Sequence, residues 1–225
     1  MMGKPSIIII AGPSAVGKTT VASRIVSLDP KFEFVRSVTT RPRRGDSFDD
    51  EYIYLTREEF EALLPVGGVL EHTEYAGAFY GTPRSEIDRI SGEGRIPILV
   101  LDINGVESLM RHKDIATCAV YVYDDLNVME KRLYDRFLGA NPTVEGLTRF
   151  ASRKDKNISD YLTICDHAPA FYAFYKNGET VDDAALGVIR IFDEFLEGKP
   201  REDENVMAVA EALRSSAEQK LNPKQ

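Results

Sequence analysis

The stretch IIIIAGPSAVGKTTVASRI, residues 7–25, decides the fold of this chain. Its four isoleucines have the length and composition of a strand that is buried on both faces. The residues from Gly12 to Thr19 satisfy the pattern G-x-x-x-x-G-K-[ST], and helical spacing of apolar residues follows over residues 19–28. A strand, a glycine-bounded loop and a helix in this order predict a loop that binds phosphate groups.

Each position of the loop has a physical role. Glycines allow backbone N–H groups to turn inward around phosphate oxygens, Lys18 can reach the β- and γ-phosphates, and Thr19 can offer its hydroxyl to Mg²⁺. The helix that follows adds its positive N-terminal end. We therefore expect a nucleoside triphosphate to bind at Gly12, Pro13, Ser14, Ala15, Val16, Gly17, Lys18, Thr19 and Thr20.

Apolar runs of strand length alternate with helical segments along the rest of the chain. This alternation predicts the α/β class, with a parallel sheet between layers of helices. The expected strands cover residues 7–11, 34–38, 96–102, 117–123 and 171–175. The expected helices cover residues 19–28, 104–111, 126–138, 144–161 and 181–196.

Two segments and a C-terminal extension depart from this alternation. Residues 52–82 hold short aromatic runs around a helix with a capping box at Thr56 and Glu59, which predicts a small mixed β insert on one edge of the main sheet. A Gly-Ala-Asn-Pro break at 139–142 precedes a basic helix, as in a mobile lid or a plain solvated helix. The expected organisation is a core (1–36 and 83–200), an insert (37–82), a lid (136–158) and an amphipathic extension (201–225).

Composition and charge limit the class of protein. The chain has 225 residues, 43% hydrophobic and 28% charged, as expected for one globular domain with a small insert. Its net charge of −8 disfavours a nucleic-acid polymer as partner. Cys118 and Cys165 have no zinc-site spacing, so we expect both to be buried in a reducing compartment. The apolar run at 7–10 is too short for a signal peptide or a membrane span, so a cytoplasmic location is expected.

Several ordered motifs follow the phosphate loop: SVTTRPRRG, EYIYLTREEFEALL, VLEHTEYAGAFYGTP, LVLDINGV and EKRLYDR. Together with GPSAVGKTT they resemble guanylate kinase, a family of P-loop nucleoside monophosphate kinases, over residues 7–196. The resemblance implies a P-loop core with a GMP-binding insert and a helical lid. It also implies transfer of the γ-phosphoryl group of ATP to GMP, with Mg²⁺, to give ADP and GDP.

The same resemblance assigns residues to GMP. The phosphate of GMP would be held by Ser37, Arg41, Arg44, Tyr52 and Tyr80. Glu71 and Thr82 would contact guanine, because a carboxylate can accept from N1–H and the 2-amino group and a hydroxyl can donate to O6. The alternatives are a helix cap for Thr82, half-buried strand aromatics for the tyrosines and a solvated basic turn for the arginines.

Asp102 and two arginines complete the expected site. Asp102 ends an apolar strand, so its carboxylate should face a ligand at the C-terminal edge of the sheet, near Mg²⁺ or the acceptor; capping the next helix is the alternative. Arg136 and Arg149 match lid arginines of the family, with surface ion pairs as the alternative. Lys18, Arg41, Arg136 and Arg149 would then supply the positive charge for transfer. We expect His72, His112 and His167 to be surface or structural residues.

The chain departs from the family at some positions. Val100 stands where an acidic residue is usual, and Ala15 stands at a common glycine position, where alanine is tolerable if φ is negative. Asn177 matches an asparagine after the last strand. A non-catalytic guanylate-kinase-like binding module and a P-loop kinase acting on a phosphorylated sugar are the alternative functions. The extension beyond residue 200 is expected to pack on the core or to form a homodimer contact.

Overall fold

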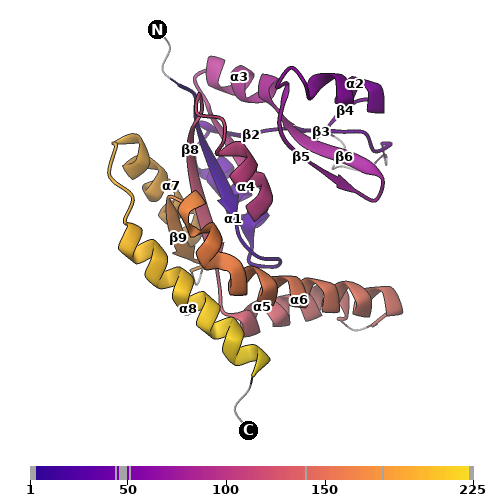
Figure 1. The fold of residues 1–225 in the computed structure, drawn as a ribbon, viewed down its shortest axis with the longest axis vertical. Coiled ribbons are helices and arrows are strands. Elements are labelled where there is room, and N and C mark those ends of the chain that lie inside the picture. The colour runs from indigo at the N-terminus through magenta and orange to yellow at the C-terminus, as the bar shows by residue number, and fades with distance from the viewer. Residues whose placement is uncertain are drawn as a thin grey trace.

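A parallel five-stranded sheet forms the centre of the protein, as the computed structural model in Figure 1 shows. The structure describes residues 4–43, 45, 50, 52–139, 141–178 and 180–222. The strand order is β2-β7-β1-β8-β9, and every neighbouring pair is parallel. The strands are β1 (Ser6–Ala11), β2 (Phe32–Phe34), β7 (Ile96–Val100), β8 (Ala116–Tyr123) and β9 (Ala173–Lys176).

The isoleucine run explains why β1 lies in the middle. Ile7, Ile8, Ile9 and Ile10 are all 0% exposed, and β1 is flanked by β7 and β8. A strand with bulky apolar residues on both faces is stable only where helices cover both sides of the sheet. The loop that follows β1 therefore extends from a buried strand in the middle of the sheet.

Six helices surround the core sheet or project from it: α1 (Lys18–Leu28), α3 (Arg84–Gly92), α4 (Ile103–Leu109), α5 (Leu126–Phe137), α6 (Val144–His167) and α7 (Val181–Leu196). We call α5 together with α6 the α5–α6 arm. Helices α1 and α7 pack against each other, and an Arg24–Asp182 ion pair of 2.6 Å joins them. Helices α3 and α4 contact β7 and β1. The predicted α/β class with a parallel core sheet is confirmed.

The insert forms a sheet of its own. Its strands, in the order β4-β3-β6-β5, are β4 (Tyr52–Tyr54), β3 (Ser37–Thr39), β6 (Ala78–Pro83) and β5 (Val69–Tyr75), with α2 (Arg57–Leu63) packed on them. The pairing is mixed, as predicted, around a small apolar core of Val38, Phe60 and Val69. Helix α2 begins at the expected capping box, with Glu59 N donating to Thr56 Oγ1 at 3.1 Å and Thr56 N to Glu59 Oε2 at 2.7 Å. The insert follows the edge strand β2 of the main sheet, where it was expected, and its strands form a sheet separate from the main one.

Three predicted boundaries need correction. The strand expected at residues 34–38 is divided, because β2 ends at Phe34 and β3 begins at Ser37 in the other sheet. The helix expected to end at residue 161 continues to His167, and β9 begins at Ala173 rather than at 171.

The two cysteines differ in burial. Cys118 is buried as expected, whereas Cys165 is only partly buried.

The C-terminal extension folds back on the chain as α8 (Asp203–Leu221). Its buried residues, Val206, Ala210, Leu213 and Ala217, are spaced by four, three and four and form one helical stripe. Figure 1 shows α8, in yellow, alongside the C-terminal part of α6, and the two helices pack together. No helix in the described ranges has both the length and the apolar character needed to cross a membrane.

Candidate functional site

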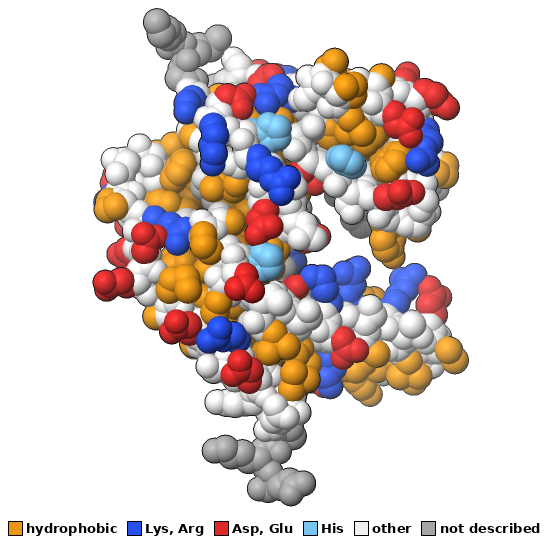
Figure 2. All heavy atoms as spheres, viewed as in Figure 1, with side chains coloured by type: hydrophobic (Ala, Val, Ile, Leu, Met, Phe, Trp, Pro, Cys, Tyr) orange, Lys and Arg blue, Asp and Glu red, His pale blue; other side chains and the backbone are white. Residues whose placement is uncertain are grey.

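A cavity of about 600 Å³ opens beside the loop that follows β1. Its lining includes the loop, the start of α1, and residues from α5, α6 and the segment after β9: Lys18, Thr19, Arg132, Arg136, Arg153 and Asn177. Figure 2 shows a hollow between the insert and the α5–α6 arm, with Lys and Arg side chains along the arm. The lining is therefore suited to an anionic ligand.

The backbone of the phosphate loop depends on two glycines. Gly12 has a φ of 144°, and a Cβ there would lie 2.1 Å from the carbonyl oxygen of Val122. Gly17, with a φ of 101°, is the N-cap of α1. Both positions favour glycine because their positive φ angles are unfavourable for residues with a Cβ atom, and at Gly12 that atom would also clash with β8.

Ala15 corrects one expectation from the sequence. Alanine was expected to be tolerable there at negative φ, but its φ is 63°, in the left-handed region. An L-residue in that region is strained by about 1 kcal/mol or more. Other contacts must therefore hold the loop in this conformation.

Lys18 lies folded over its own loop. Its Nζ donates to the carbonyl oxygens of Gly12 at 2.7 Å and Pro13 at 2.9 Å. Burial lowers the pKa of Lys18 to about 8, against the opposing charges of Asp160 and Asp102. A bound phosphate group would give this ammonium a stronger partner than two neutral carbonyls.

Side chains from three other elements bind the carbonyl groups of the loop. Asn177 Nδ2 donates to Val16 O at 2.7 Å, and Arg132 Nη1 donates to Ala15 O at 3.4 Å. Asn157 Nδ2 on α6 donates to Ser14 O at 3.0 Å. Of these three residues, only Asn177 could be identified from the sequence; Arg132 and Asn157 could not.

The residues predicted to hold the GMP phosphate gather on the insert. Arg41 is 8% exposed, and its guanidinium lies 4.9 Å from the ring centre of Tyr52. Tyr52 in turn meets Tyr80 edge to face at 6.1 Å, and Ser37 pairs with Tyr52 in the β3–β4 register. The structure therefore brings four of the five residues together, while Arg44 lies outside the described residues.

Glu71 and Thr82 are partners in the structure. Thr82 Oγ1 donates to Glu71 Oε1 at 2.6 Å, across the register of β5 and β6. Burial raises the pKa of Glu71, and the hydrogen bond from Thr82 opposes that rise. Thr82 lies within β6 and Pro83 is the N-cap of α3, so the alternative of a capping role for Thr82 is wrong. The expected donation to guanine O6 requires Thr82 to leave Glu71.

Asp102 has the alternative role that the sequence left open. It is the N-cap of α4, and its Oδ1 accepts from Gly105 N at 2.9 Å. The negative charge of Asp102 also affects the pKa values of two site residues. It adds to the rise in the pKa of Glu71 and opposes the lowering of the pKa of Lys18. The carboxylate thus caps a helix and lies near the residues expected to bind the two nucleotides.

The donor set fits a magnesium ion that arrives with a nucleotide. Thr19 offers a hydroxyl on the cavity wall, and Asp102 offers a carboxylate near Lys18. In the described part of the chain, no group of three or more His, Cys, Asp or Glu side chains could hold a metal alone. Mg²⁺ commonly binds through one or two protein oxygens, water and substrate phosphates, so a complete protein cage is not needed.

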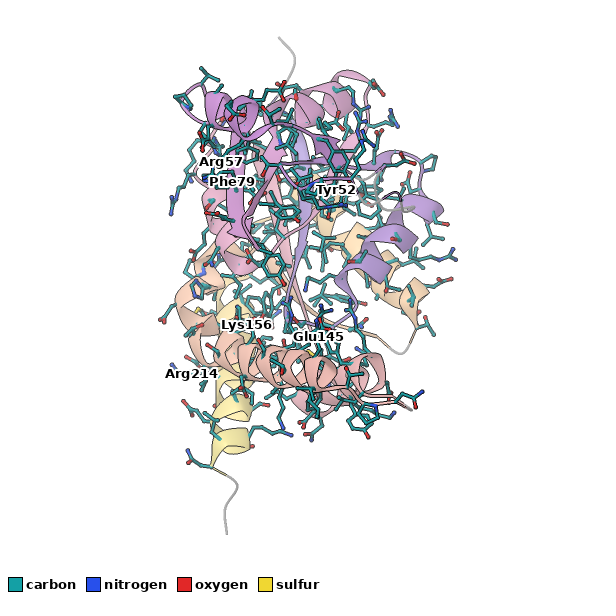
Figure 3. All side chains as sticks on the ribbon, turned by 90° about the vertical axis from the view of Figure 1, so that its right-hand side faces the viewer. Tyr52, Arg57, Phe79, Glu145, Lys156 and Arg214 are labelled. Atoms are coloured by element: carbon teal, nitrogen blue, oxygen red, sulfur yellow. The ribbon has the colours of Figure 1, made fainter. Side chains whose placement is uncertain are left out.

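The two predicted lid arginines differ in position. Arg136 lines the cavity, whereas Arg149 is absent from the described lining residues and pairs with Glu145 at 2.6 Å. Figure 3 shows Tyr52 on the insert in the upper part of the view and Glu145 and Lys156 on α6 in the lower part. The alternative of a surface ion pair therefore holds for Arg149 in this arrangement.

Two arginines that line the cavity, Arg132 and Arg153, were not among the predicted site residues. Arg132 stands four residues before Arg136 on α5, and Arg153 stands four residues after Arg149 on α6. Residues four apart share one face of a helix, so this spacing was the available signal.

The histidines have structural contacts, as expected. His112 Nε2 lies 2.9 Å from Leu70 O, and His167 Nδ1 lies 2.7 Å from Glu107 Oε1. The ring of the exposed His72 lies at the edge of Phe60 and Phe79.

Comparison with known proteins finds guanylate kinases among the proteins similar to this chain. The guanylate kinase family model matches residues 4–158. A guanylate kinase of Streptococcus agalactiae serotype III (strain NEM316) is 38% identical over 135 residues, which cover 58% of this chain and 63% of the relative. The match therefore spans less than two thirds of that relative's length. A guanylate kinase of Lactobacillus delbrueckii subsp. bulgaricus is 29% identical over 197 residues, 87% of this chain and 97% of the relative.

A solved structure supports the fold. The crystal structure of guanylate kinase from Anaplasma phagocytophilum superposes with a TM-score of 0.57 at 22% identity, covering 88% of this chain and 90% of that chain. The residues matched by the family model include the phosphate loop, the whole insert and α6 as far as residue 158. The chain belongs to the guanylate kinase family.

Proposed function

We propose that this protein phosphorylates GMP to GDP with ATP as the phosphoryl donor. The carrying observation is the hydrogen-bonded Glu71–Thr82 pair on the insert, in a chain that also has an intact phosphate loop. A carboxylate beside a hydroxyl matches the N1–H, 2-amino and O6 groups of guanine, whereas adenine lacks the same donors. The names of the two bacterial relatives agree with this substrate.

In this proposal ATP binds in the cavity, with its phosphates against the loop amides and Lys18. Mg²⁺ would be held by Thr19 and Asp102, directly or through water, and would neutralise phosphate charge. Arg132, Arg136 and Arg153 add positive charge from the α5–α6 arm. The GMP phosphate would lie near Ser37, Arg41, Tyr52 and Tyr80 on the insert.

The reaction would be an in-line displacement. An oxygen of the GMP phosphate forms a bond to the γ-phosphorus of ATP, while the bond from that phosphorus to the β–γ bridging oxygen breaks and ADP leaves. Such transfer depends on positioning and charge stabilisation and needs no covalent protein intermediate. Arg149 would join the site only after the arm moves toward the insert.

Two other functions remain as alternatives in the experiment. A non-catalytic binding module would bind GMP without turnover, but Lys18 and Thr19 are both intact in this chain. A kinase for a phosphorylated sugar would have no use for the Glu71–Thr82 pair. Acceptor specificity therefore separates all three functions.

The experiment measures ADP formation from Mg·ATP with GMP, AMP, CMP, UMP or no acceptor. Lys18→Ala is compared with Lys131→Ala, which removes an exposed lysine on α5. We expect turnover with GMP alone, abolished by Lys18→Ala and retained by Lys131→Ala. Binding of GMP without any acceptor-dependent ADP would contradict the proposal and support a binding module.

A further inference from the structure

Three successive carbonyl groups of the phosphate loop accept hydrogen bonds from side chains on other elements. Ser14 O binds Asn157 of α6, Ala15 O binds Arg132 of α5, and Val16 O binds Asn177 after β9. Loop amides can face phosphate oxygens only if the loop carbonyls face elsewhere, because each peptide unit presents the two groups in opposite directions. These side chains thus hold the orientation that a phosphate site needs.

Asn157 differs from the other two in making two hydrogen bonds to one residue. Its Oδ1 accepts from Ser14 N at 2.7 Å, while its Nδ2 donates to Ser14 O at 3.0 Å. The side chain is 2% exposed, so water cannot readily replace either bond. Asn157 therefore fixes both backbone groups of Ser14.

The neighbouring residue explains why such a contact matters. Ala15 follows Ser14 directly and has a φ of 63°, which is unfavourable for alanine. A short loop containing this strain would relax toward negative φ if its flanking peptide groups were free. Relaxation would turn loop amides away from the phosphates, since changing φ and ψ rotates the adjoining peptide planes.

Helix α6 is itself firmly held at the level of Asn157. Its buried residues are Asn157, Ile158, Tyr161 and Ile164 in the C-terminal half and Gly146 near the start. Tyr161 Oη donates to Asp124 O at 2.7 Å, and α8 packs along the helix. The side chain that binds Ser14 thus projects from a fixed support.

We propose that Asn157 is a positioning residue that keeps the phosphate loop in its nucleotide-binding conformation against the strain at Ala15. This inference rests on the proposed binding of ATP at the loop. It also limits the movement of the arm, because Asn157 stays bound to Ser14 and any closing segment must end before residue 157. In this proposal the lid, predicted at about 136–158, would end on the N-terminal side of Asn157.

The test compares the affinity for Mg·ATP with the stability of the fold. Asn157→Leu keeps a similar side-chain size and removes both hydrogen bonds, whereas Ile164→Val trims another buried residue of α6 remote in sequence from the contact. We expect Asn157→Leu to raise the dissociation constant and the KM for Mg·ATP about tenfold, with a smaller effect on KM for GMP. Ile164→Val should lower the melting temperature and leave both nucleotide constants unchanged. An unchanged ATP affinity in folded Asn157→Leu would overturn the proposal.

A double-mutant cycle with Ala15→Gly gives a second readout. Glycine adopts the left-handed conformation without strain, so Ala15→Gly should restore part of the ATP affinity that Asn157→Leu removes. Purely additive effects would mean that Asn157 acts through packing and not through the loop, and would overturn the proposal.

Asn157→Asp decides the matter if the leucine variant does not fold. Its ionised carboxylate can still accept from Ser14 N but cannot donate to Ser14 O, so we expect a raised dissociation constant for Mg·ATP at pH 8. An unchanged ATP affinity in folded Asn157→Asp at this pH would overturn the proposal. Failure of the proposed function is distinguishable, because it appears as wild-type protein without GMP-dependent turnover, whatever the variants do to ATP binding.

Discussion

Thr82 Oγ1 donates a hydrogen bond of 2.6 Å to Glu71 Oε1, so the two residues assigned to guanine bind each other in the structure. The hydroxyl proton of Thr82 is used within the pair, so the hydroxyl must turn from Glu71 before it can donate to guanine O6. Burial raises the pKa of Glu71, with the charge of Asp102 adding to the rise. A base that donates two hydrogens to the Glu71 carboxylate would stabilise its ionised form.

Glu71→Gln tests this assignment. The amide places an N–H group against the donors of guanine, so we expect kcat/KM for GMP to fall by at least about 100-fold, or roughly 3 kcal/mol. Thr82→Val should have a smaller effect, about tenfold, because the carboxylate remains. Steady-state kinetics with saturating Mg·ATP measures both. Equal losses in Glu71→Gln and in the exposed β5 variant Glu74→Gln would contradict the assignment.

The lowered pKa of Lys18 predicts that ATP binding depends on pH. Its pKa is lowered to about 8 by burial, which outweighs the favourable charges of Asp160 and Asp102, while Arg153 and Lys156 lower it further. Above pH 8 the free protein therefore loses the ammonium that should face the phosphates. We expect the dissociation constant for Mg·ATP to rise between pH 8 and 9.5, with proton uptake on binding.

Calorimetry in buffers of different ionisation enthalpy measures that uptake. In Lys18→Met the affinity should be weak and nearly constant across the same range. The free wild-type protein should also gain stability as the pH rises from about 8 toward the ordinary value of 10.5, because the unfolded chain then binds more protons than the folded chain. Proton release on binding of Mg·ATP at pH 8.5 would contradict this prediction.

Most of the core could be predicted because its signals are local. Four isoleucines before Gly12 place β1, and the capping box of Thr56 and Glu59 places the start of α2. Such signals depend on residues that are close in sequence. They identify elements but do not say which sheet a strand joins.

The errors follow from contacts between residues that are distant in sequence. Phe34 and Ser37 belong to different sheets although only Val35 and Arg36 separate them in the sequence. Asn157 and Ser14 are 143 positions apart, so no spacing rule could relate them. The resemblance to the family assigned Arg149 as a lid arginine. In the structure it pairs with Glu145, because its position relative to the cavity depends on the orientation of the α5–α6 arm.

Ala15→Gly should stabilise the protein. Ala15 and Ala76 are the two described residues other than glycine with positive φ, at 63° and 51°. Glycine removes the side-chain strain but adds freedom to the unfolded chain, so a net gain of about 0.5–1 kcal/mol is expected at each site. Urea unfolding of Ala15→Gly, with Ala76→Gly as the matched change in the β5–β6 turn, measures this gain. A loss of stability in Ala15→Gly alone would mean that local contacts favour the methyl group.

The Arg36–Glu86 pair joins the two chain connections between the sheets. Arg36 lies between β2 and β3, and Glu86 lies in the first turn of α3 after β6. Arg36 Nε and Nη2 donate to the two Glu86 oxygens at 2.9 and 3.0 Å, and Arg89 Nε donates to Oε1 at 2.9 Å. The hydrogen bond from Arg36 is the largest cause that lowers the pKa of Glu86 to about 2, although Arg36 itself is half-exposed.

Glu86→Gln should therefore destabilise the protein in a pH-dependent way. Because its folded pKa is lowered, the contribution of Glu86 is complete above its ordinary pKa of 4.5 and is lost as the pH falls toward 2. At pH 7 we expect Glu86→Gln to reduce the free energy of unfolding by about 1–3 kcal/mol, at the low end for a buried pair because Arg36 is partly solvated. Glu61→Gln, which breaks the exposed Arg57–Glu61 pair, should change it by less than about 0.5 kcal/mol. Urea titrations at pH 7 and pH 3 separate the two carboxylates, since a difference between Glu86→Gln and the wild type that persists undiminished at pH 3 would have to come from packing and not from charge.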